Sequence, residues 1–291
     1  MKTFKLPVLA AAAALLAAVF VGPTPASAAG PVVQPPRQSW SFAGPFGKYD
    51  PTQLQRGYKI YREVCASCHA MSLVAFRNLS QPGGPGFSEA QVKALAAEYK
   101  VQDGPNDSGD MFERPGRPAD RFVSPFANPQ QAMAANGGAY PPDLSVMAKA
   151  RTYERGFPWF VFDIFTQYVE QGPDYLAALL NGYEDPPAGF PLPDGKYYNK
   201  YFPGNVIAMP KVLNDGQVEY PKDASGRPQA PETVAQYSKD VTAFMMWAAE
   251  PHLEARKALG LKVMLFLLVF AGLLYFTKKR IWSRVEGHAH A

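Results

Sequence analysis

The 291-residue sequence predicts a mainly α-helical exported domain with long loop insertions, held by one C-terminal transmembrane helix. Apolar segments lie near both ends of the chain. Between them, helical patterns are separated by stretches rich in proline and glycine, and no part alternates regularly enough to indicate a large sheet. The 29 Pro and 24 Gly approach a disorder-like composition, but aromatic residues make up 13% of the chain, which favours a folded domain.

The N-terminal apolar segment has the features of a secretory signal peptide. Lys2 and Lys5 precede the apolar residues 6–21, and the small residues Ala-Ser-Ala follow at 26–28. The alternative, a permanent membrane helix, is disfavoured because crossing a bilayer takes ~20 residues. We therefore expect residues 1–28 to be a signal peptide that is removed after Ala28.

The second apolar segment, residues 258–277, contains a single charge, Lys262, and predicts a transmembrane anchor. A basic cluster follows it directly: Lys278, Lys279, Arg280 and Arg284. Basic residues beside a membrane helix favour the cytoplasmic side. We therefore expect residues 278–291 to be a cytoplasmic tail and residues 29–257 to be a domain on the opposite, periplasmic side.

The charge of the exported part differs from that of the whole chain. Residues 29–250 contain 20 Lys and Arg against 23 Asp and Glu, a net charge of −3, so the sequence gives no support for nucleic-acid binding. Five acidic residues between 98 and 113 are accompanied within that run only by Lys100: Glu98, Asp103, Asp107, Asp110 and Glu113. Such a run is either a solvated loop or a docking surface for a basic partner.

Four segments show helical spacing of apolar residues: 51–64, 88–100, 174–183 and 231–251. The first begins at Asp50-Pro51, a capping residue followed by proline, and leads directly to Cys65. The third is expected to be capped by Asp174 and to end at Asn181-Gly182. The aromatic segment 158–169 is ambiguous between helix and strand.

The only two cysteines, Cys65 and Cys68, are separated by two residues and followed at once by His69. This is the attachment pattern of haem c. Each thiol adds to one vinyl group of the porphyrin, and the next residue is then placed to bind the iron through its imidazole. The pattern predicts one covalent haem c with His69 as an iron ligand, and it accounts for both thiols.

Three other uses of the cysteines explain the pattern less well. A thioredoxin-like redox pair normally lies in a βαβ context, which the sequence does not show. A structural zinc site needs four ligands, whereas the other histidines lie beside or beyond the predicted membrane helix: His252, His288 and His290. A disulfide between the two cysteines would leave His69 unexplained.

The second axial ligand decides whether the iron transfers electrons or binds small molecules, because methionine opposite histidine raises the reduction potential and closes the iron. The candidates are Met71, Met111, Met133, Met147, Met209, Met245 and Met246. Met71 is too near His69 to reach the opposite face, and for any methionine core packing is the alternative. We favour Met209, which lies in a loop punctuated by proline and glycine.

From about Gly44 to Trp282 the chain resembles the cytochrome c1 family. The resemblance rests on "VCASCHAM", "GGAYPPDLSVMAKAR", "LLNGYEDPPAG", "YYNKYFPGNVIAMP" and "DVTAFMMWAAEP", followed by the single C-terminal anchor. The haem pattern alone is common to many cytochromes, whereas "PPDLS" and "WAAEP" in this order are specific. The resemblance implies a cytochrome c-like helical fold with long loop insertions, in which the porphyrin completes the core.

The same resemblance implies the residues of the site. Cys65 and Cys68 would hold the haem, and His69 and Met209 would ligate its iron. Arg151 and Tyr175 match positions that contact a haem propionate, which a guanidinium can pair with and a phenol can donate to. Without the resemblance these two are an ordinary surface arginine and half-buried tyrosine.

The resemblance also implies a function in the inner membrane of a bacterium. The chain would be the one-electron carrier of the quinol–cytochrome c oxidoreductase (bc1) complex, passing electrons from the Rieske iron–sulfur subunit to a soluble cytochrome c. Cytochrome b, the Rieske subunit and membrane lipid would be its partners in a dimeric complex, and the chain would perform no substrate chemistry itself. The alternatives are a membrane-anchored cytochrome of another dehydrogenase, and a haem enzyme or sensor with an open sixth site.

One segment departs from the family pattern. Residues 152–174 form a longer, aromatic-rich connection than in mitochondrial relatives. Some bacterial members carry an additional disulfide, which a chain with two haem-bound cysteines cannot form. We expect packing, to which this insertion would contribute, to brace the distal region instead.

Overall fold

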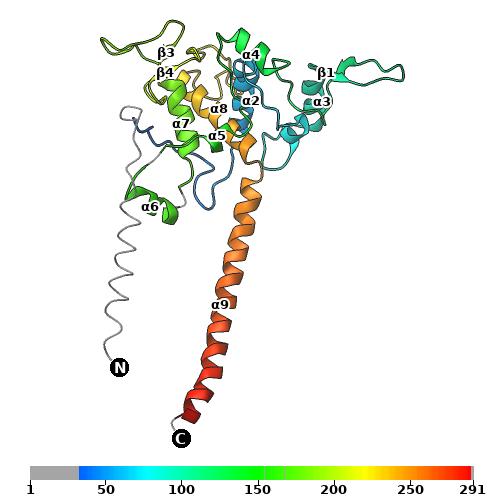
Figure 1. Cartoon of the computed structure of the whole chain (residues 1–291). Coiled ribbons are helices and arrows are strands. Elements are labelled where there is room, and N and C mark those ends of the chain that lie inside the picture. Colours follow the sequence, from blue (N-terminus) through cyan, green and yellow to red (C-terminus); the bar gives the residue numbers. More distant parts are fainter. Residues whose placement is uncertain (1–32, 154, 167, 290–291) are drawn as a thin grey trace. The chain divides into compact units, whose positions relative to one another are not determined.

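The computed structural model describes residues 33–153, 155–166 and 168–289, and its described part is mainly helical, as predicted (Figure 1). The predicted signal peptide lies outside these residues. The α-helices are α2 (Pro51–Glu63), α3 (Glu89–Ala97), α4 (Pro129–Ala135), α5 (Met147–Ala150), α6 (Trp159–Thr166), α7 (Gln171–Asn181), α8 (Val234–Ala249) and α9 (Leu253–Ala289). Two short 3₁₀ helices cover Cys65–Ser67 and Phe76–Ser80.

The strands form two small antiparallel pairs. Strand β1 (Lys100–Asp103) pairs with β2 (Phe112–Pro115), so that Lys100 lies opposite Pro115. Strand β3 (Tyr197–Tyr198) pairs with β4 (Val206–Ile207). Both pairs belong to the long loops, and the helices form the core.

Helix α2 begins where the sequence predicts. The Asp50 side chain accepts a hydrogen bond from the backbone N–H of Thr52 at 2.9 Å, and Pro51 occupies the first helical turn. The helix ends at Glu63, and the N–H of the next residue, Val64, still bonds the Ile60 carbonyl at 2.9 Å. The cysteine pattern therefore follows directly from a capped, rigid helix.

Helices α2 and α8 pack closely against each other at the centre of the core. A Cβ atom added to Gly57 would lie 2.2 Å from the Asp240 carbonyl oxygen and 2.7 Å from Cβ of Phe244, so only glycine allows this approach. The buried aromatic rings of Tyr58 and Phe244 meet across the contact at 5.6 Å between centroids.

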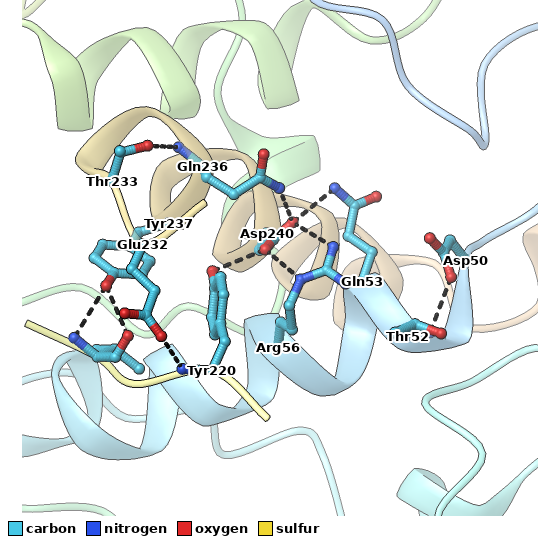
Figure 2. Close-up of polar contacts among 11 residues, drawn as sticks. Asp50, Thr52, Gln53, Arg56, Tyr220, Glu232, Thr233, Gln236, Tyr237 and Asp240 are labelled. Atoms are coloured by element: carbon cyan, nitrogen blue, oxygen red, sulfur yellow. Dashed lines mark hydrogen bonds and ion pairs between the residues drawn. The ribbon is translucent and has the colours of Figure 1, made fainter. Parts of the chain in front are cut away.

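A buried carboxylate fixes the same contact (Figure 2). Asp240 on α8 is fully buried and pairs with Arg56 on α2, whose Nε lies 2.7 Å from Oδ2. Burial acts to lower the pKa of the Arg56 guanidinium, but the hydrogen bond to Asp240 and the negative charge of that carboxylate together outweigh it, so the pKa is raised. Three further donors reach the carboxylate at 2.8 to 3.0 Å: Gln53, Tyr220 and Gln236.

Helix α7 starts earlier than predicted, and the expectation that Asp174 caps it is wrong. The helix begins at Gln171, and Asp174 is buried inside it. Its carboxylate accepts from the Trp40 indole at 2.8 Å, from the Gln38 N–H at 3.0 Å and from the Tyr168 hydroxyl. An aspartate has the same appearance in sequence whether it caps a helix or receives donors from distant segments.

The aromatic insertion is helical, which resolves the ambiguity of residues 158–169 in favour of α6. Most of its large side chains do not pack into the core: Phe157, Trp159, Phe160, Phe162 and Phe165 are 52 to 80% exposed. Tyr168 alone of the aromatic residues described between 157 and 169 is buried. Helix α6 therefore does not brace the domain by packing, whereas the residues on either side of it do: Tyr153 packs against the core and Tyr168 is buried.

Three residues separate the end of α8 from the start of α9, and polar contacts hold the first turns of α9. The Tyr49 N–H donates to the Glu254 carboxylate at 3.0 Å, and the Lys257 ammonium donates to the Phe42 carbonyl at 2.6 Å. Beyond them the described apolar side chains from Leu259 to Trp282 are exposed, as a membrane-spanning helix requires. The predicted anchor, 258–277, lies within this helix, which continues to Ala289.

Candidate haem-binding site

The cysteine pattern forms one tight turn at the end of α2. The N–H groups of Cys68 and His69 both bond the Cys65 carbonyl, at 3.1 and 2.9 Å. Both thiols are free in the described structure although only two residues separate them. Burial, with a smaller contribution from Cys68, raises the pKa of the Cys65 thiol to about 12. Two thiols and an imidazole are thus presented from a single turn.

His69 is held in the tautomer that can bind a metal. Its Nδ1 lies 2.8 Å from the Pro142 carbonyl oxygen, which can only accept, so Nδ1 carries the proton. The lone pair of Nε2 remains available for iron. Burial lowers the pKa of His69 although the Pro142 carbonyl opposes this, and the neutral imidazole is the form that ligates metals.

The segment after His69 is fixed to the segment that contains Pro142. The Leu144 N–H donates to the Ala70 carbonyl at 2.8 Å. The Asp143 carboxylate accepts from the N–H and hydroxyl of Ser72 at 2.9 and 2.7 Å, and the Leu73 N–H donates to the Ser145 hydroxyl at 3.0 Å. These bonds explain why "PPDLS" accompanies the haem pattern, since this segment orients the histidine.

Met209 lies in the loop after β4, half-buried, with its backbone held in place. The Tyr183 hydroxyl donates to the Met209 carbonyl at 3.0 Å. The loop turns on Asn205, which adopts a positive φ of 61° and donates from its side chain to the carbonyls of Asn199 and Lys200. The thioether is therefore the free end of a residue whose backbone is fixed.

A buried asparagine joins this loop to α7. The Asn199 side chain donates to the Leu179 carbonyl at 2.8 Å and accepts from the N–H groups of Tyr201 and Phe202. A Cβ on Gly182 would lie 2.8 Å from the Asn199 amide oxygen, so glycine is required where the loop meets the helix end.

The other candidate methionines are less suitable as ligands. Four are in the core and at most 9% exposed: Met71, Met147, Met245 and Met246. Met111 is 61% exposed beside strand β2, and Met133 is half-buried on the short helix α4. Met209 remains the candidate that we favour, and its role as an iron ligand stays a prediction.

Arg151 and Tyr175, the predicted propionate contacts, are neighbours. Burial raises the pKa of Tyr175, and the positive charge of Arg151 lowers it, so the two side chains are within electrostatic reach. Arg151 is exposed at the end of α5, whereas the Tyr175 side chain is buried on α7. Gly172 allows the two helices to meet, because a Cβ there would lie 1.9 Å from the Ala148 carbonyl.

Helix α7 connects the two halves of the site. Its first half packs on α5, which follows the His69-orienting segment, and its end receives the Asn199 side chain of the Met209 loop. No hydrogen bond or ion pair between described residues links His69 to Met209 directly. The donor set of two thiols, one imidazole nitrogen and one thioether fits a covalent haem c.

Sequence reasoning missed the residues that hold these ligands. Pro142 acts through its carbonyl, which every residue possesses, so its type gives no signal. Tyr183 contacts the Met209 loop, and Asn199 contacts helix α7. Each of these contacts joins positions that are distant in sequence. All three residues lie in segments that carry the family resemblance, "GGAYPPDLSVMAKAR", "LLNGYEDPPAG" and "YYNKYFPGNVIAMP", but the sequence did not indicate what they contact.

The acidic run 98–113 is less negative than its sequence suggests. Glu98 pairs with Arg62 at 2.8 Å, and Asp103 pairs with Arg114. The exposed acids that remain are Asp107, Asp110 and Glu113, on and beside the turn between β1 and β2. Any docking surface for a basic partner is therefore smaller than expected.

Comparison with known proteins finds one family model and several relatives that are similar to this chain. Residues 40–285 match the model of the Cytochrome C1 family. The chain is 65% identical over 251 residues to cytochrome b/c1 of Bradyrhizobium diazoefficiens, covering 86% of this chain but only 36% of that protein. It is 50% identical over 277 residues to cytochrome c1 of Blastochloris viridis, covering 95% and 96% of the two chains, and 45% identical over 251 residues to cytochrome c1 of Rhodospirillum rubrum, covering 86% and 88%.

Proposed function

The chain belongs to the cytochrome c1 family, and on that basis we propose that Cys65 and Cys68 attach its haem c while His69 and Met209 ligate the iron. Haem c supplies the one-electron change between ferrous and ferric iron. The single observation that carries the assignment is the His69 Nδ1 contact with the Pro142 carbonyl, because it leaves Nε2 free as a ligand.

The residues around these ligands would favour electron transfer. The Tyr183 hydroxyl holds the Met209 backbone, which would help to keep the thioether on a bound haem iron and so exclude small molecules. Arg151 and Tyr175 supply a guanidinium and a phenol for a propionate, which compensates its charge. One-electron transfer needs no side chain as an acid or base, and we propose no substrate chemistry for this chain.

The route of the electron follows from the family. The chain accepts an electron from a Rieske iron–sulfur subunit and donates it to a soluble cytochrome c, as part of a quinol–cytochrome c oxidoreductase that also contains cytochrome b. The name of the Bradyrhizobium diazoefficiens relative, cytochrome b/c1, agrees with cytochrome b as a partner. We extend the proposal to a dimeric complex.

Helix α9 anchors the chain in a membrane as a single span. We place the haem domain on the periplasmic side of a bacterial inner membrane and the C-terminus in the cytoplasm, because the basic residues Lys278, Lys279 and Arg280 follow the apolar segment.

The test is the optical spectrum of the full chain, matured with haem and solubilised, with and without reductant and carbon monoxide. We expect covalent haem, no carbon monoxide binding by the parent and binding by Met209→Ala. The matched control is Met133→Ala, another half-buried methionine, which should behave as the parent. Carbon monoxide binding by the parent would instead support a haem enzyme or sensor, and absence of covalent haem would refute the assignment of Cys65 and Cys68.

The subunit composition of the purified complex distinguishes a bc1 complex from another dehydrogenase. Co-purification with a cytochrome b and an iron–sulfur subunit supports the bc1 complex. For the soluble acceptor, neutralising Asp107, Asp110 and Glu113 should slow oxidation by a basic cytochrome c at low salt, since charge complementarity speeds encounter. An unchanged rate would remove this surface from the account.

A further inference from the structure

Helix α6 presents an aromatic face that no described part of the chain covers. Its exposed side chains include Trp159, Phe160, Phe162 and Phe165, the last at 80% exposure. Exposed aromatic side chains concentrated on one short helix indicate a site of interaction with a membrane or another protein. The one ionisable residue of the helix, Asp163, pairs with Arg155, so the face carries no uncompensated charge.

The exposure does not come from a detached segment, because the chain after α6 is tied to the core. The Tyr168 ring is buried, and its hydroxyl donates to the buried Asp174 and lies 3.3 Å from the Tyr153 hydroxyl. The Arg37 guanidinium lies over the same ring, 3.9 Å from its centroid. The helix therefore has a fixed attachment close to its C-terminal end.

This attachment lies at the base of the membrane anchor. Asp174, which holds the Tyr168 hydroxyl, also accepts from the Trp40 indole, and the Trp40 ring stacks on Phe42 at 5.2 Å between centroids. The Phe42 carbonyl in turn accepts from the Lys257 ammonium at 2.6 Å. Lys257 immediately precedes the apolar segment 258–277. Glu170 is the fourth residue after Thr166, so the end of α6 lies at most ~14 Å from Glu170.

We propose that the aromatic face of α6 lies in the interfacial layer of the membrane that α9 crosses. Phenylalanine and tryptophan with a compensated charge are the side chains that such a layer accepts. Because the attachment of α6 lies near the start of the apolar segment, a lipid surface at α6 would be continuous with the one that covers α9. The inference rests on α9 as a membrane anchor. The insertion 152–174 would then be attached both to the core, at Tyr168, and to the membrane, through α6. The membrane contact would fix the orientation of the haem domain above the bilayer.

The experiment uses the full, haem-matured chain in phosphatidylcholine–phosphatidylglycerol vesicles. Single cysteines replace exposed side chains, Phe162→Cys and Phe165→Cys, and carry a nitroxide. Asp107→Cys, exposed in the turn between β1 and β2, is the matched control. The parent chain, whose two cysteines are proposed to be bound to haem, must take up no label, and each variant must keep the parent haem spectrum.

We expect the nitroxides at 162 and 165 to collide more with oxygen than with a water-soluble nickel chelate, and the nitroxide at 107 to show the reverse. Chelate accessibility at 162 and 165 equal to that at 107 would overturn the inference. Protection from both reagents would also overturn it, because it indicates cover by protein. Flotation of the chain with the vesicles tests the membrane anchor α9 separately. Nitroxide label on the parent chain would contradict the proposed attachment of haem to Cys65 and Cys68, not the inference about α6.

Discussion

The buried ion pair between Arg56 and Asp240 allows a quantitative prediction of how much it stabilises the core. Replacing Arg56 by methionine keeps most of the side-chain volume but removes the cation from a carboxylate that is fully buried. Removing one partner of a buried ion pair typically costs 3–5 kcal/mol, because the remaining charge stays desolvated.

The structure places the expected loss at the lower end of that range. Three neutral donors remain on Asp240 after the substitution: Gln53, Tyr220 and Gln236. They compensate part of the lost interaction, so we expect the free energy of unfolding to fall by about 3 kcal/mol. With a urea dependence of about 2 kcal/mol per molar, the unfolding midpoint should fall by about 1.5 M.

The assay is urea unfolding of the detergent-solubilised, haem-containing chain, followed by tryptophan fluorescence. Trp247 on α8 is 1% exposed and reports the core directly. The control is Lys59→Met on the same helix, which breaks an exposed pair with Glu63 and should cost less than about 0.5 kcal/mol. Equal losses for Arg56→Met and Lys59→Met would refute the claim that the buried pair holds α2 against α8.

Other parts of the structure give further predictions. Gly57→Ala places a Cβ 2.2 Å from a carbonyl of α8, so unfolding in urea should show a loss of 1–3 kcal/mol or more, and wild-type stability would contradict the close helix contact. Tyr183→Phe removes the donor to the Met209 carbonyl and should loosen the loop by about 1 kcal/mol, seen as partial carbon monoxide binding that the parent lacks. The hydrogen bond from the Arg114 guanidinium lowers the pKa of Asp120 from 3.8 to about 2, so its stabilisation is present above pH 4 and lost as the pH falls toward 2. The stability difference between the parent and Asp120→Asn, measured by urea unfolding at several pH values, should shrink over that interval, and a constant difference would contradict the pairing.

Local signals in the sequence were sufficient for the helices that begin with their own caps. Asp50-Pro51 predicted α2, and the periodic apolar residues predicted α8. The start of α7 was missed because Asp174, a good capping residue by type, is held inside the fold by the Trp40 indole and the Tyr168 hydroxyl. Whether an acidic residue caps a helix or accepts buried donors depends on distant segments that the local pattern does not contain.

Local sequence patterns were limited in the same way for the candidate haem-binding site. The haem pattern identified Cys65, Cys68 and His69 because the chemistry requires those residue types at that spacing. The groups that orient the ligands are long-range: the Pro142 carbonyl is 73 residues from His69, and the Tyr183 hydroxyl is 26 residues from Met209. Such partners emerge only when the chain is folded.

The central claim is that Met209 completes the iron coordination opposite His69. Iron K-edge X-ray absorption of the full, haem-matured chain measures this directly, because a sulfur ligand scatters differently from nitrogen or oxygen. We predict a sulfur scatterer in the parent and in the control Met133→Ala, and its loss in Met209→Ala. A sulfur scatterer that persists in Met209→Ala, or that the parent lacks, would contradict the account.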